Sequence, residues 1–373
     1  MNKLGPFDIK FSKEFRKEFY QSCEQIFDEG YLTNHHFVTK FEKEFSKFSK
    51  APFSLMTSSG TSALEIALRT IGVRGKKVII PSCTFIATAL AVINAGGEPV
   101  ILDIEDEYFS LAPKGLKENI NADVAAVITV HIGGHISPRI LDIVDICKEA
   151  GLPLVEDCAH AHGASFQGKT AGTFGLVGCF SHFLTKVMTT GEGGSIVFNN
   201  QKDYEKAKSI RQFGMDPENP LLHIQEGINS KVTEFQGALG LIELKRITSR
   251  IEKRRVLAGR YSQNLKSSRW KVIADNDEMN SSYYKQIVVP LFKINRSDIV
   301  SALAEENINL TGGVYYYPLH NQPSLKKFVG KGMDFSIVDE FAKNHICPPC
   351  YPELTEKDID RTCNVLLKLS NEK

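Results

Sequence analysis

The first half of the chain alternates short apolar runs with segments of helical periodicity, and this alternation restricts the possible folds most. Four runs have the composition of buried strands, namely "KKVIIPS", "EPVILDI", "VAAVITVH" and "LPLVEDC". Segments between them, such as "ILDIVDICKEA", carry apolar residues at helical spacing. Apolar strands that alternate with helices predict an α/β fold with a mostly parallel central sheet flanked by helices. Ligands of such folds bind beyond the carboxyl ends of the strands.

The chain is too long for one small core, so we expect two domains in its 373 residues. One long helical pattern runs from Lys231 to Ile251, "SSYYKQIVVPLF" predicts a strand and "RSDIVSALAEENI" predicts a helix. We predict a large ligand-binding domain with an N-terminal helical arm over residues 1–240 and a small C-terminal α+β domain over residues 241–373. The basic run "RIEKRR" is interpreted as the solvated face of a helix.

The charge balance argues against nucleic acid and membrane surfaces as partners. With 45 basic and 44 acidic residues the net charge is +1, so no general attraction to polyanions is expected. The uncharged stretch from Val78 to Gly97 has about the length of a membrane span. Pro81 and Asn94 interrupt it, which favours a buried strand, a turn and a buried helix.

The N-terminal residues and the cysteines together predict a cytoplasmic protein. The N-terminal stretch has no apolar run that would predict a signal peptide. Eight cysteines are scattered through the chain, which is typical of a reducing compartment. Cys347 and Cys350 in "CPPC" have metal-ligand spacing, but no second pair accompanies them, so we interpret them as a structural turn and expect no metal site.

Two groups with acid–base potential follow the strand in "LVEDCAHAHGA". Asp157 ends the apolar run, and His160 follows three residues later. A carboxylate at the end of a buried strand needs a cationic or hydrogen-bonding partner, which a ligand could provide. Alternatively, Asp157 caps the next segment and His160 is a satisfied core histidine.

A helix start in "TSSGTSALEIAL" has the features of an anion site. The pattern "SALE" resembles a capping box, so we predict that the helix begins near Ser62. The small residues from Ser58 to Thr61 lead into it, and free amides at a helix N-terminus suit a phosphate. The alternative is a plain helix cap. No Gly-Lys-Ser/Thr ending follows, which argues against a nucleotide P-loop.

A single lysine, Lys186, lies in "VGCFSHFLTKVMTTGEGGSIVF", which we interpret as strand, turn and strand. Ser181 precedes it by five residues, so its hydroxyl and the lysine amine could face one ligand. The alternative is an exposed loop lysine, the usual fate of this residue type. A phosphate-type helix start, an aspartate after a buried strand and a later lysine together describe a pyridoxal phosphate (PLP) site.

Several motifs resemble one family, the DegT/DnrJ/EryC1/StrS sugar aminotransferases. They are "SSGTSAL", "PSCTFIATA", "VEDCAHAHGA", "CFSHFLTK", "TTGEGGSIV" and "ALGLIEL", in that order, and the resemblance extends from about Gly30 to Tyr351. It implies the fold of aspartate aminotransferase (fold type I) and a PLP-dependent transfer of an amino group from glutamate to a keto or aldehydo sugar by ping-pong kinetics.

The resemblance also implies roles for matching positions. Lys186 would hold the cofactor covalently and move a proton as a catalytic base, and the second catalytic residue, Asp157, would bind the pyridine nitrogen. The remaining cofactor-binding positions are expected to be Gly60, Thr61, Ser62 and Ser181 at the phosphate, Phe85 and His160 at the ring, and Asn229 from a partner subunit. A homodimer with shared active sites is therefore expected.

This chain departs from the family pattern mainly at positions that we expect near the substrate. They are His182, Phe183, Val187, Ile228, Ser230, Lys231 and Tyr315. We infer an unusual acceptor, with an eight-carbon keto-sugar acid of the 3-deoxy-octulosonate type as the leading candidate. A nucleotide-linked keto-hexose and a cyclitol ketone are the alternatives.

Three other functions were weighed against the aminotransferase. A PLP-dependent sugar dehydratase of the same family would carry histidine in place of Lys186. A non-catalytic sensor would not be expected to keep Asp157, His160, Ser181 and Lys186 together. A generic nucleotide-binding protein would carry a Gly-rich phosphate motif, which the chain does not have.

Overall fold

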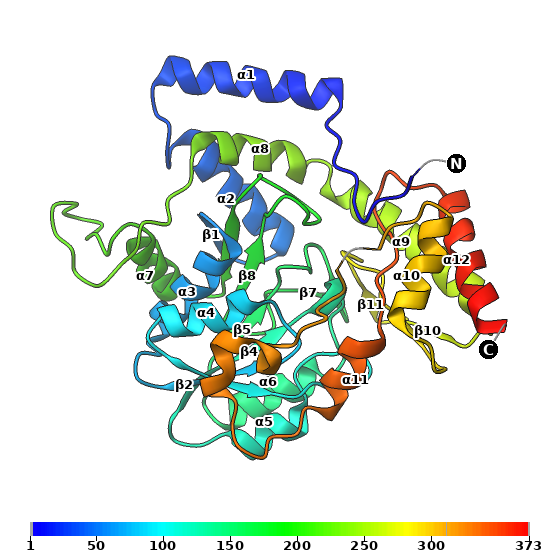
Figure 1. The fold of residues 1–373 in the computed structure, drawn as a ribbon. Helices are drawn as coiled ribbons and strands as arrows, with labels where there is room; N and C mark the ends of the chain where they lie inside the picture. The colour runs from blue at the N-terminus through cyan, green and yellow to red at the C-terminus, as the bar shows by residue number, and fades with distance from the viewer. Residues whose placement is uncertain (1–2, 311, 372–373) are drawn as a thin grey trace.

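A seven-stranded sheet lies at the centre of the computed structural model, which describes residues 3–310 and 312–371 (Figure 1). Its strand order is β1-β9-β8-β5-β4-β2-β3. The strands are β1 (Phe53–Thr57), β2 (Lys77–Pro81), β3 (Glu98–Leu102), β4 (Val124–Val130), β5 (Leu154–Asp157), β8 (Val177–Ser181) and β9 (Gly194–Phe198). The pairs β2–β3, β2–β4, β4–β5 and β5–β8 are parallel, while β9 pairs antiparallel with β1 and β8. The predicted α/β fold with a mostly parallel sheet is confirmed.

Helices cover both faces of this sheet, as Figure 1 shows. They are α3 (Gly60–Ile71), α4 (Ile86–Asn94), α5 (Pro113–Asn119), α6 (Ile140–Glu149), α7 (Gln201–Arg211) and the short 3-10 helix η1 (Ile132–Gly134). The stretch from Val78 to Gly97 forms most of β2, a turn and α4, as predicted. Across the described ranges, no helix combines the length and the hydropathy that a bilayer span requires.

The N-terminal arm consists of α1 (Lys13–Glu29) and α2 (His36–Ser49), which pack with α8 (Glu234–Leu244). The expected single long helix is wrong, because it is divided at Lys245 and Arg246 into α8 and α9 (Ile247–Leu265). The two parts pack against different partners: α8 contacts α1 and α2, whereas α9 contacts α12 and β10.

The C-terminal region packs around a core of its own. Its elements are β10 (Trp270–Val272), β11 (Met279–Asn280), β12 (Val288–Pro290), α10 (Arg296–Glu305), η2 (Leu319–Asn321), η3 (Pro323–Phe328), α11 (Ser336–Asn344) and α12 (Glu356–Asn371). The strands β6 (Ser165–Phe166) and β7 (Lys169–Thr170) form a small sheet with β11. The second core runs from Leu257 to Leu366 and includes Leu4, which bridges to Ile308. The boundary at residues 240/241 stays a prediction.

Two local expectations for this region need correction. The stretch "SSYYKQIVVPLF" is mostly loop, and only Val288–Pro290 is a strand. The first half of this stretch is held by hydrogen bonds from side chains, such as those of Arg254 and Arg255, and not by strand pairing. The structural turn expected at "CPPC" is also wrong, because residues 347–350 form an irregular segment in which both cysteines are buried free thiols. The helix expected over "RSDIVSALAEENI" is confirmed as α10.

Candidate active site

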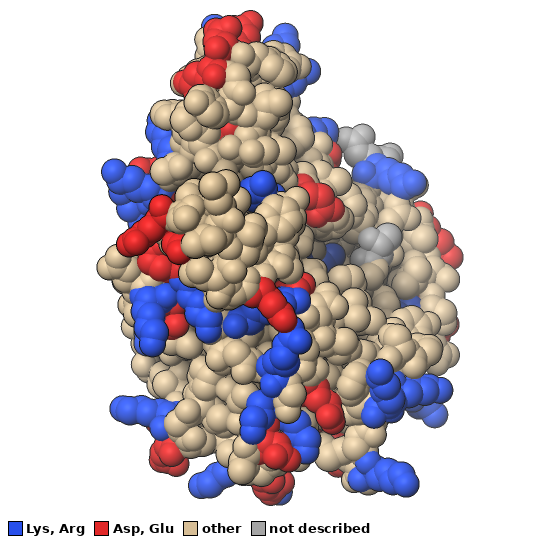
Figure 2. Space-filling view, turned by 90° about the vertical axis from the view of Figure 1, so that its left-hand side faces the viewer, with Lys and Arg blue, Asp and Glu red and all other residues tan. Residues whose placement is uncertain are grey.

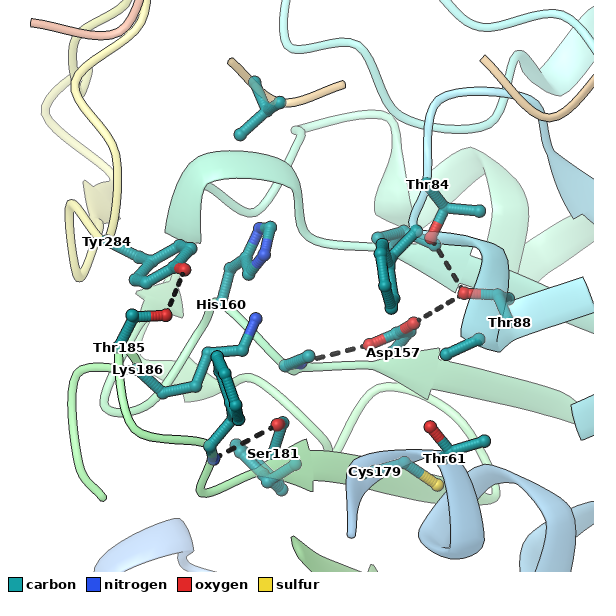
Figure 3. A pocket seen from close by; sticks show the side chains of 18 of the residues that line it. Thr61, Thr84, Thr88, Asp157, His160, Cys179, Ser181, Thr185, Lys186 and Tyr284 are labelled. Carbon is teal, nitrogen blue, oxygen red and sulfur yellow. Dashed lines mark hydrogen bonds between the residues drawn. The ribbon is translucent and has the colours of Figure 1, made fainter. Parts of the chain in front are cut away.

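A cavity of about 580 Å³ lies at the carboxyl ends of β5 and β8, a size typical of small-molecule sites. Asp157 and Ser181 are the last residues of these strands. Seven of the nine predicted site residues line the cavity: Gly60, Thr61, Phe85, Asp157, His160, Ser181 and Lys186. The topology therefore brings together segments that are far apart in the sequence (Figure 3).

The N-terminus of α3 forms one end of the cavity. The helix begins at Gly60 rather than near Ser62, because Ser59 is the N-cap and forms a reciprocal capping box with Ser62. A Cβ atom on Gly60 would lie 2.7 Å from Cβ of Ser181, so only glycine lets the helix end approach β8 this closely. The first amides of a helix have no partner within the helix, and here they lie beside two hydroxyls, those of Thr61 and Ser181. This end of the cavity suits an anion.

Asp157 lies at the end of β5 and is almost fully buried. Its Oδ2 accepts a hydrogen bond from Oγ1 of Thr88 at 2.9 Å, and its Oδ1 accepts one from the amide of Ala159 at 3.1 Å. Burial raises the pKa of this carboxyl, although both hydrogen bonds oppose the shift. A cationic N–H group in the cavity would favour the ionised form of Asp157.

Lys186 follows β8 in the loop between β8 and β9, and its side chain points into the cavity (Figure 3). Its Nζ lies 4.7 Å from the centre of the Tyr284 ring. Burial lowers the pKa of this amine, while Tyr284 and Asp157 act in the opposite direction. The predicted lysine is therefore not an exposed loop residue, and its environment favours the neutral, nucleophilic form.

The proton of His160 can be placed from its neighbours. Burial lowers the pKa of its imidazole well below the usual range, so the ring is neutral. Nδ1 accepts a hydrogen bond from the amide of Gly133 at 3.3 Å, which leaves the proton on Nε2. Nε2 lies 3.2 Å from the hydroxyl oxygen of Tyr315 and donates to it. The hydroxyl proton of Tyr315 is then free to donate into the cavity.

The opposite wall of the cavity comes from the C-terminal region, and sequence reasoning missed most of it. It includes Tyr284, Lys285, Gly313 and Tyr315. The hydroxyl of Tyr284 lies 3.1 Å from Oγ1 of Thr185 in the lysine loop. Tyr315 had been noted only as a departure from a family pattern, and no local signal in "SSYYKQIVVPLF" pointed to a binding wall.

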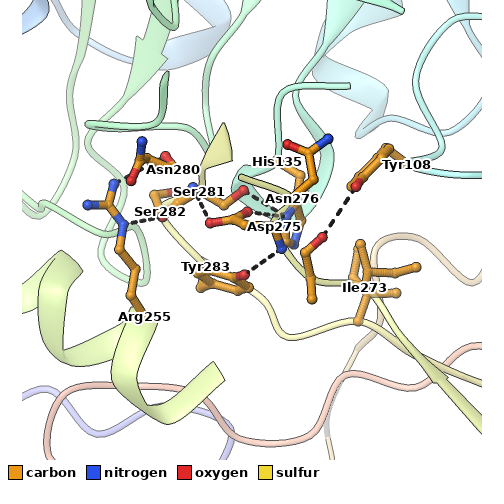
Figure 4. A network of polar contacts seen from close by, with 12 residues as sticks. Tyr108, His135, Arg255, Ile273, Asp275, Asn276, Asn280, Ser281, Ser282 and Tyr283 are labelled. Atoms are coloured by element: carbon orange, nitrogen blue, oxygen red, sulfur yellow. Dashed lines mark hydrogen bonds and ion pairs between the residues drawn. The ribbon is translucent and has the colours of Figure 1, made fainter. Parts of the chain in front are cut away.

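A polar network fixes this wall against the large domain (Figure 4). The amide of Ser281 donates to Oδ2 of Asp275 at 2.8 Å, and its hydroxyl lies 2.9 Å from Nδ1 of His135. Arg255 donates from Nε to the carbonyl oxygen of Ser281 at 2.8 Å. Arg254, in the same basic run, is buried and donates to the carbonyl oxygen of Tyr283 at 3.2 Å. The interpretation of this run as a solvated face is therefore wrong for Arg254.

Two predicted site residues do not line the cavity. Ser62 uses its side chain in the cap of α3, where its Oγ accepts from the amide of Ser59 at 2.9 Å. Asn229 is exposed and forms a β-bridge with Gln212, at the base of the loop that follows α7 and protrudes in Figure 1. Figure 2 shows that the face with this loop carries a broad area without charged side chains. Exposed apolar side chains on the loop include Phe213, Leu221, Leu222 and Ile224.

Two unusual neighbours of Lys186 face the core instead of the cavity. His182 is fully buried, with Nε2 2.7 Å from Oγ of Ser195 and the rings of Phe41 and Phe45 around it. Val187 is also buried, and neither residue is among those that line the cavity. The interpretation that both mark an unusual acceptor is therefore wrong, whereas Phe183 does line the cavity.

Glu156, beside Asp157, has a purely structural environment. It is fully buried, and its carboxylate accepts from the amides of Gly172 and Gly175 at 2.8 and 2.7 Å. Nε2 of His131 lies 2.9 Å from the same carboxylate. Successive residues of a strand point to opposite faces, which explains why Asp157 alone reaches the cavity.

The fold and the cavity define an α/β enzyme in which a half-buried lysine faces a carboxylate and a helix N-terminus. Residues 13–367 match the DegT/DnrJ/EryC1/StrS aminotransferase family, and the chain belongs to this family. This confirms the family inferred from the motifs and the predicted class of enzyme, a PLP-dependent sugar aminotransferase.

Known proteins resemble the chain over nearly its whole length. GDP-perosamine synthase from Vibrio cholerae is 29% identical over 92% of this chain and 94% of its own length. A putative pyridoxal phosphate-dependent aminotransferase, EpsN, from Bacillus subtilis is 30% identical over 89% of this chain and 87% of its own length. The structure of DesV from S. venezuelae, in complex with a ketimine intermediate, superposes with a TM-score of 0.92, covers 99% of both chains and is 25% identical.

Proposed function

We propose that the enzyme transfers the amino group of L-glutamate to the keto or aldehydo carbon of a sugar, with PLP bound in the cavity. The observation that carries the proposal is one cavity that holds a lysine of lowered pKa, a buried carboxylate and a helix N-terminus. These three groups match the three chemical features of the cofactor, which are an aldehyde, a basic ring nitrogen and a phosphate.

The residues present fit the cofactor in shape as well as in chemistry. Gly60, Thr61 and Ser181 would hold the phosphate, because a side chain at Gly60 would fill this space. Asp157 would hold the protonated ring nitrogen, and Phe85 is exposed toward the cavity and can stack on a flat ring. PLP, when bound, supplies the electron sink that lets a proton leave the α-carbon of the donor.

Lys186 then carries out the proton transfers of both half-reactions. In the first half-reaction its neutral Nζ would take the proton from the α-carbon of glutamate and pass it to the former aldehyde carbon of the cofactor. In the second half-reaction Nζ would take a proton from that carbon and deliver it to the carbon of the acceptor that receives the amino group. Tyr284 and Tyr315 line this side of the cavity. Glutamate and the sugar would occupy the same space in turn, which gives ping-pong kinetics.

The acceptor that we favour is a keto-sugar acid of the 3-deoxy-octulosonate type. A nucleotide-linked keto-hexose is the second candidate, because relatives over most of the chain are named GDP-perosamine synthase. The two candidates differ in where they carry negative charge, so a substrate screen can separate them.

The central experiment is a spectrum of the purified enzyme with PLP, followed by a donor and acceptor screen. A lysine-bound cofactor should absorb in the visible, and glutamate should bleach this band with release of 2-oxoglutarate. Keto-sugar acids and nucleotide-linked keto-sugars are then tested for recovery of the band. A protein that gains no visible band with PLP would contradict the proposal.

We also propose that the active unit is a homodimer in which Asn229 reaches the cavity of the partner subunit. Its exposed position and the apolar side chains around it support this arrangement. Mixing Lys186→Ala with Asn229→Ala subunits tests it. If Asn229 acts across the interface, mixed dimers contain one intact site and regain activity. If it acts within its own chain, every site stays defective and no activity returns.

A further inference from the structure

A second lysine, Lys285, lines the cavity beside the groups already described. Its backbone is fixed, because its amide donates to the carbonyl oxygen of Gly133 at 3.1 Å. Ser282, three residues earlier, donates from its amide to the carbonyl oxygen of Gly134 at 3.0 Å. Its hydroxyl donates to the carbonyl oxygen of His160 at 2.7 Å. Lys285 is therefore held on the same turn that orients His160.

The ammonium group of Lys285 has no anionic partner among the residues that the structure describes. Its Nζ lies 5.5 Å from the centre of the Tyr284 ring, on which Nζ of Lys186 also lies. Its charge acts on Lys186, where it reinforces the pKa-lowering effect of burial. The positive charge of Lys285 in a partly buried cavity has no anion to offset it, so this charge costs free energy unless a ligand supplies one.

The carboxylates at the cavity do not compensate this charge. Asp157 accepts hydrogen bonds from Thr88 and Ala159 on the opposite side. Glu192, the other carboxylate among the described lining residues, is exposed to solvent. A charge without a partner at a fixed position in a binding cavity indicates that the ligand supplies the partner.

The phosphate of the cofactor does not fit this role. In Figure 3, Tyr284 and Thr61 lie on opposite sides of the cavity, with Lys186 between them. Lys285 belongs to the Tyr284 side, whereas the anion end formed by α3 and Ser181 lies on the Thr61 side. The anion that Lys285 binds must therefore arrive with a substrate.

We propose that Lys285 binds a substrate carboxylate and so makes the enzyme selective for acidic substrates. This rests on the proposed aminotransferase function and sharpens its substrate class. Glutamate offers such a carboxylate in the first half-reaction, and a keto-sugar acid offers one in the second. A ping-pong enzyme can use one cationic position for both, because the two substrates occupy the cavity in turn.

Direct binding tests the anion site without turnover. The PLP-loaded enzyme is titrated calorimetrically with glutarate, a dicarboxylate without an amine. Replacing Lys285 by Gln should weaken binding roughly 10- to 100-fold, the usual range for a hydrogen bond to a charged group. Lys285→Arg should restore most of the affinity. Lys266→Gln, which removes an exposed lysine outside the cavity, should leave it unchanged. Equal affinity of Lys285→Gln and the wild type would overturn the proposal.

Half-reactions then show which substrate uses the site. Bleaching by glutamate and recovery of the band with a keto-sugar acid are measured separately in the wild type and in Lys285→Gln. A raised KM in either half-reaction, with kcat changed less, supports the carboxylate site and identifies its source. A loss confined to nucleotide diphosphate sugars would overturn it in favour of a diphosphate site. If the wild type gains no visible band, the proposed function fails, and the same glutarate titration, run on the protein without cofactor, still decides whether Lys285 binds a carboxylate.

Discussion

Two aspartates have opposite electrostatic environments: Asp157, which lines the cavity, and Asp275, which lies in the polar network behind the wall. Asp157 ends β5, and burial raises the pKa of its carboxyl despite hydrogen bonds from Thr88 and Ala159. Asp275 belongs to the network of Figure 4. Burial opposes its charge too, but the hydrogen bond from Ser281 and the nearby His135 ring, whose Nδ1 lies 3.8 Å from Oδ1, outweigh burial and lower its pKa. The protein therefore disfavours the charge of Asp157 and favours the charge of Asp275.

This difference indicates that Asp157 has a role in ligand binding and that Asp275 has a structural role. Asp157 gains its missing stabilisation only when a cationic N–H enters the cavity, so its charge costs free energy in the free protein. Asp275 is already stabilised within the protein and holds Ser281, which begins the segment that presents Tyr284 and Lys285 to the cavity. The large domain supplies reactive groups, and the C-terminal region supplies a rigid surface.

The largest effect is expected when the amine of Lys186 is removed from the cavity. Lys186→Ala should lower turnover by roughly 10³-fold or more, because nucleophile and proton carrier are lost together. The variant should also lose the visible band with PLP while keeping its fold. We expect added methylamine to restore part of the rate, since a free amine can reach the vacated space. Turnover within tenfold of the wild type, with no amine added, would contradict the assignment.

Removing the charge of Asp157 should separate activity from stability. Asp157→Asn should lose about 10²- to 10³-fold in turnover, because the ring nitrogen is no longer held in its protonated form. The same change should stabilise the cofactor-free protein at neutral pH. A raised folded-state pKa means that stability falls as pH rises above the unfolded value of about 3.9, so the gain should vanish in acid. Urea unfolding at several pH values measures it, and lower stability at neutral pH would contradict the comparison.

The reactive side could be predicted from the sequence because its groups follow strands at short, regular distances. Asp157 ends an apolar run, Ser181 ends another, and Lys186 follows five residues later. Parallel strands place these ends at one edge of a sheet, so their order in the chain was enough to indicate one site.

The wall could not be predicted, because its position depends on contacts across long sequence distances. Tyr284 and Lys285 lie in a loop that the apolar residues after it led us to predict as a strand. Arg254 and Arg255, which we predicted on a solvated helix face, donate hydrogen bonds to backbone carbonyls of this loop. His182 was wrongly predicted to lie near the substrate, because it is close to Lys186 in the sequence. Its side chain instead points into the core, where it packs against Phe45.

Breaking the network at Asp275 should affect the wall and spare the reactive groups. Asp275→Asn should lower the free energy of unfolding by about 2 kcal/mol at neutral pH, the typical cost of losing hydrogen bonds to a charged group. A lowered folded-state pKa means that this stabilisation is present above the unfolded value and is lost as pH falls through the folded one. The difference from the wild type should therefore begin to shrink near pH 4 and disappear only below the lowered folded-state pKa.

The same variant gives a functional readout that stability alone does not. A displaced wall should raise KM for the acceptor while the visible band with PLP stays, because Asp157 and Lys186 are untouched. Asp277→Asn, two residues along in the same loop and outside the network, is the matched control and should change neither quantity. Loss of the PLP band in Asp275→Asn would show that the two sides of the cavity are not separable.

The smallest effect is expected at Tyr315, where the two sides meet. Nε2 of His160 donates to the Tyr315 hydroxyl at 3.2 Å, which leaves the hydroxyl proton for a ligand oxygen. Tyr315→Phe keeps the ring and removes one hydrogen bond of about 1 kcal/mol, so kcat/KM for the acceptor should fall roughly fivefold. PLP retention and the glutamate half-reaction should not change. A fall as large as that of Lys186→Ala would instead make this hydroxyl a proton-transfer group, and the wall would then take part in the chemistry.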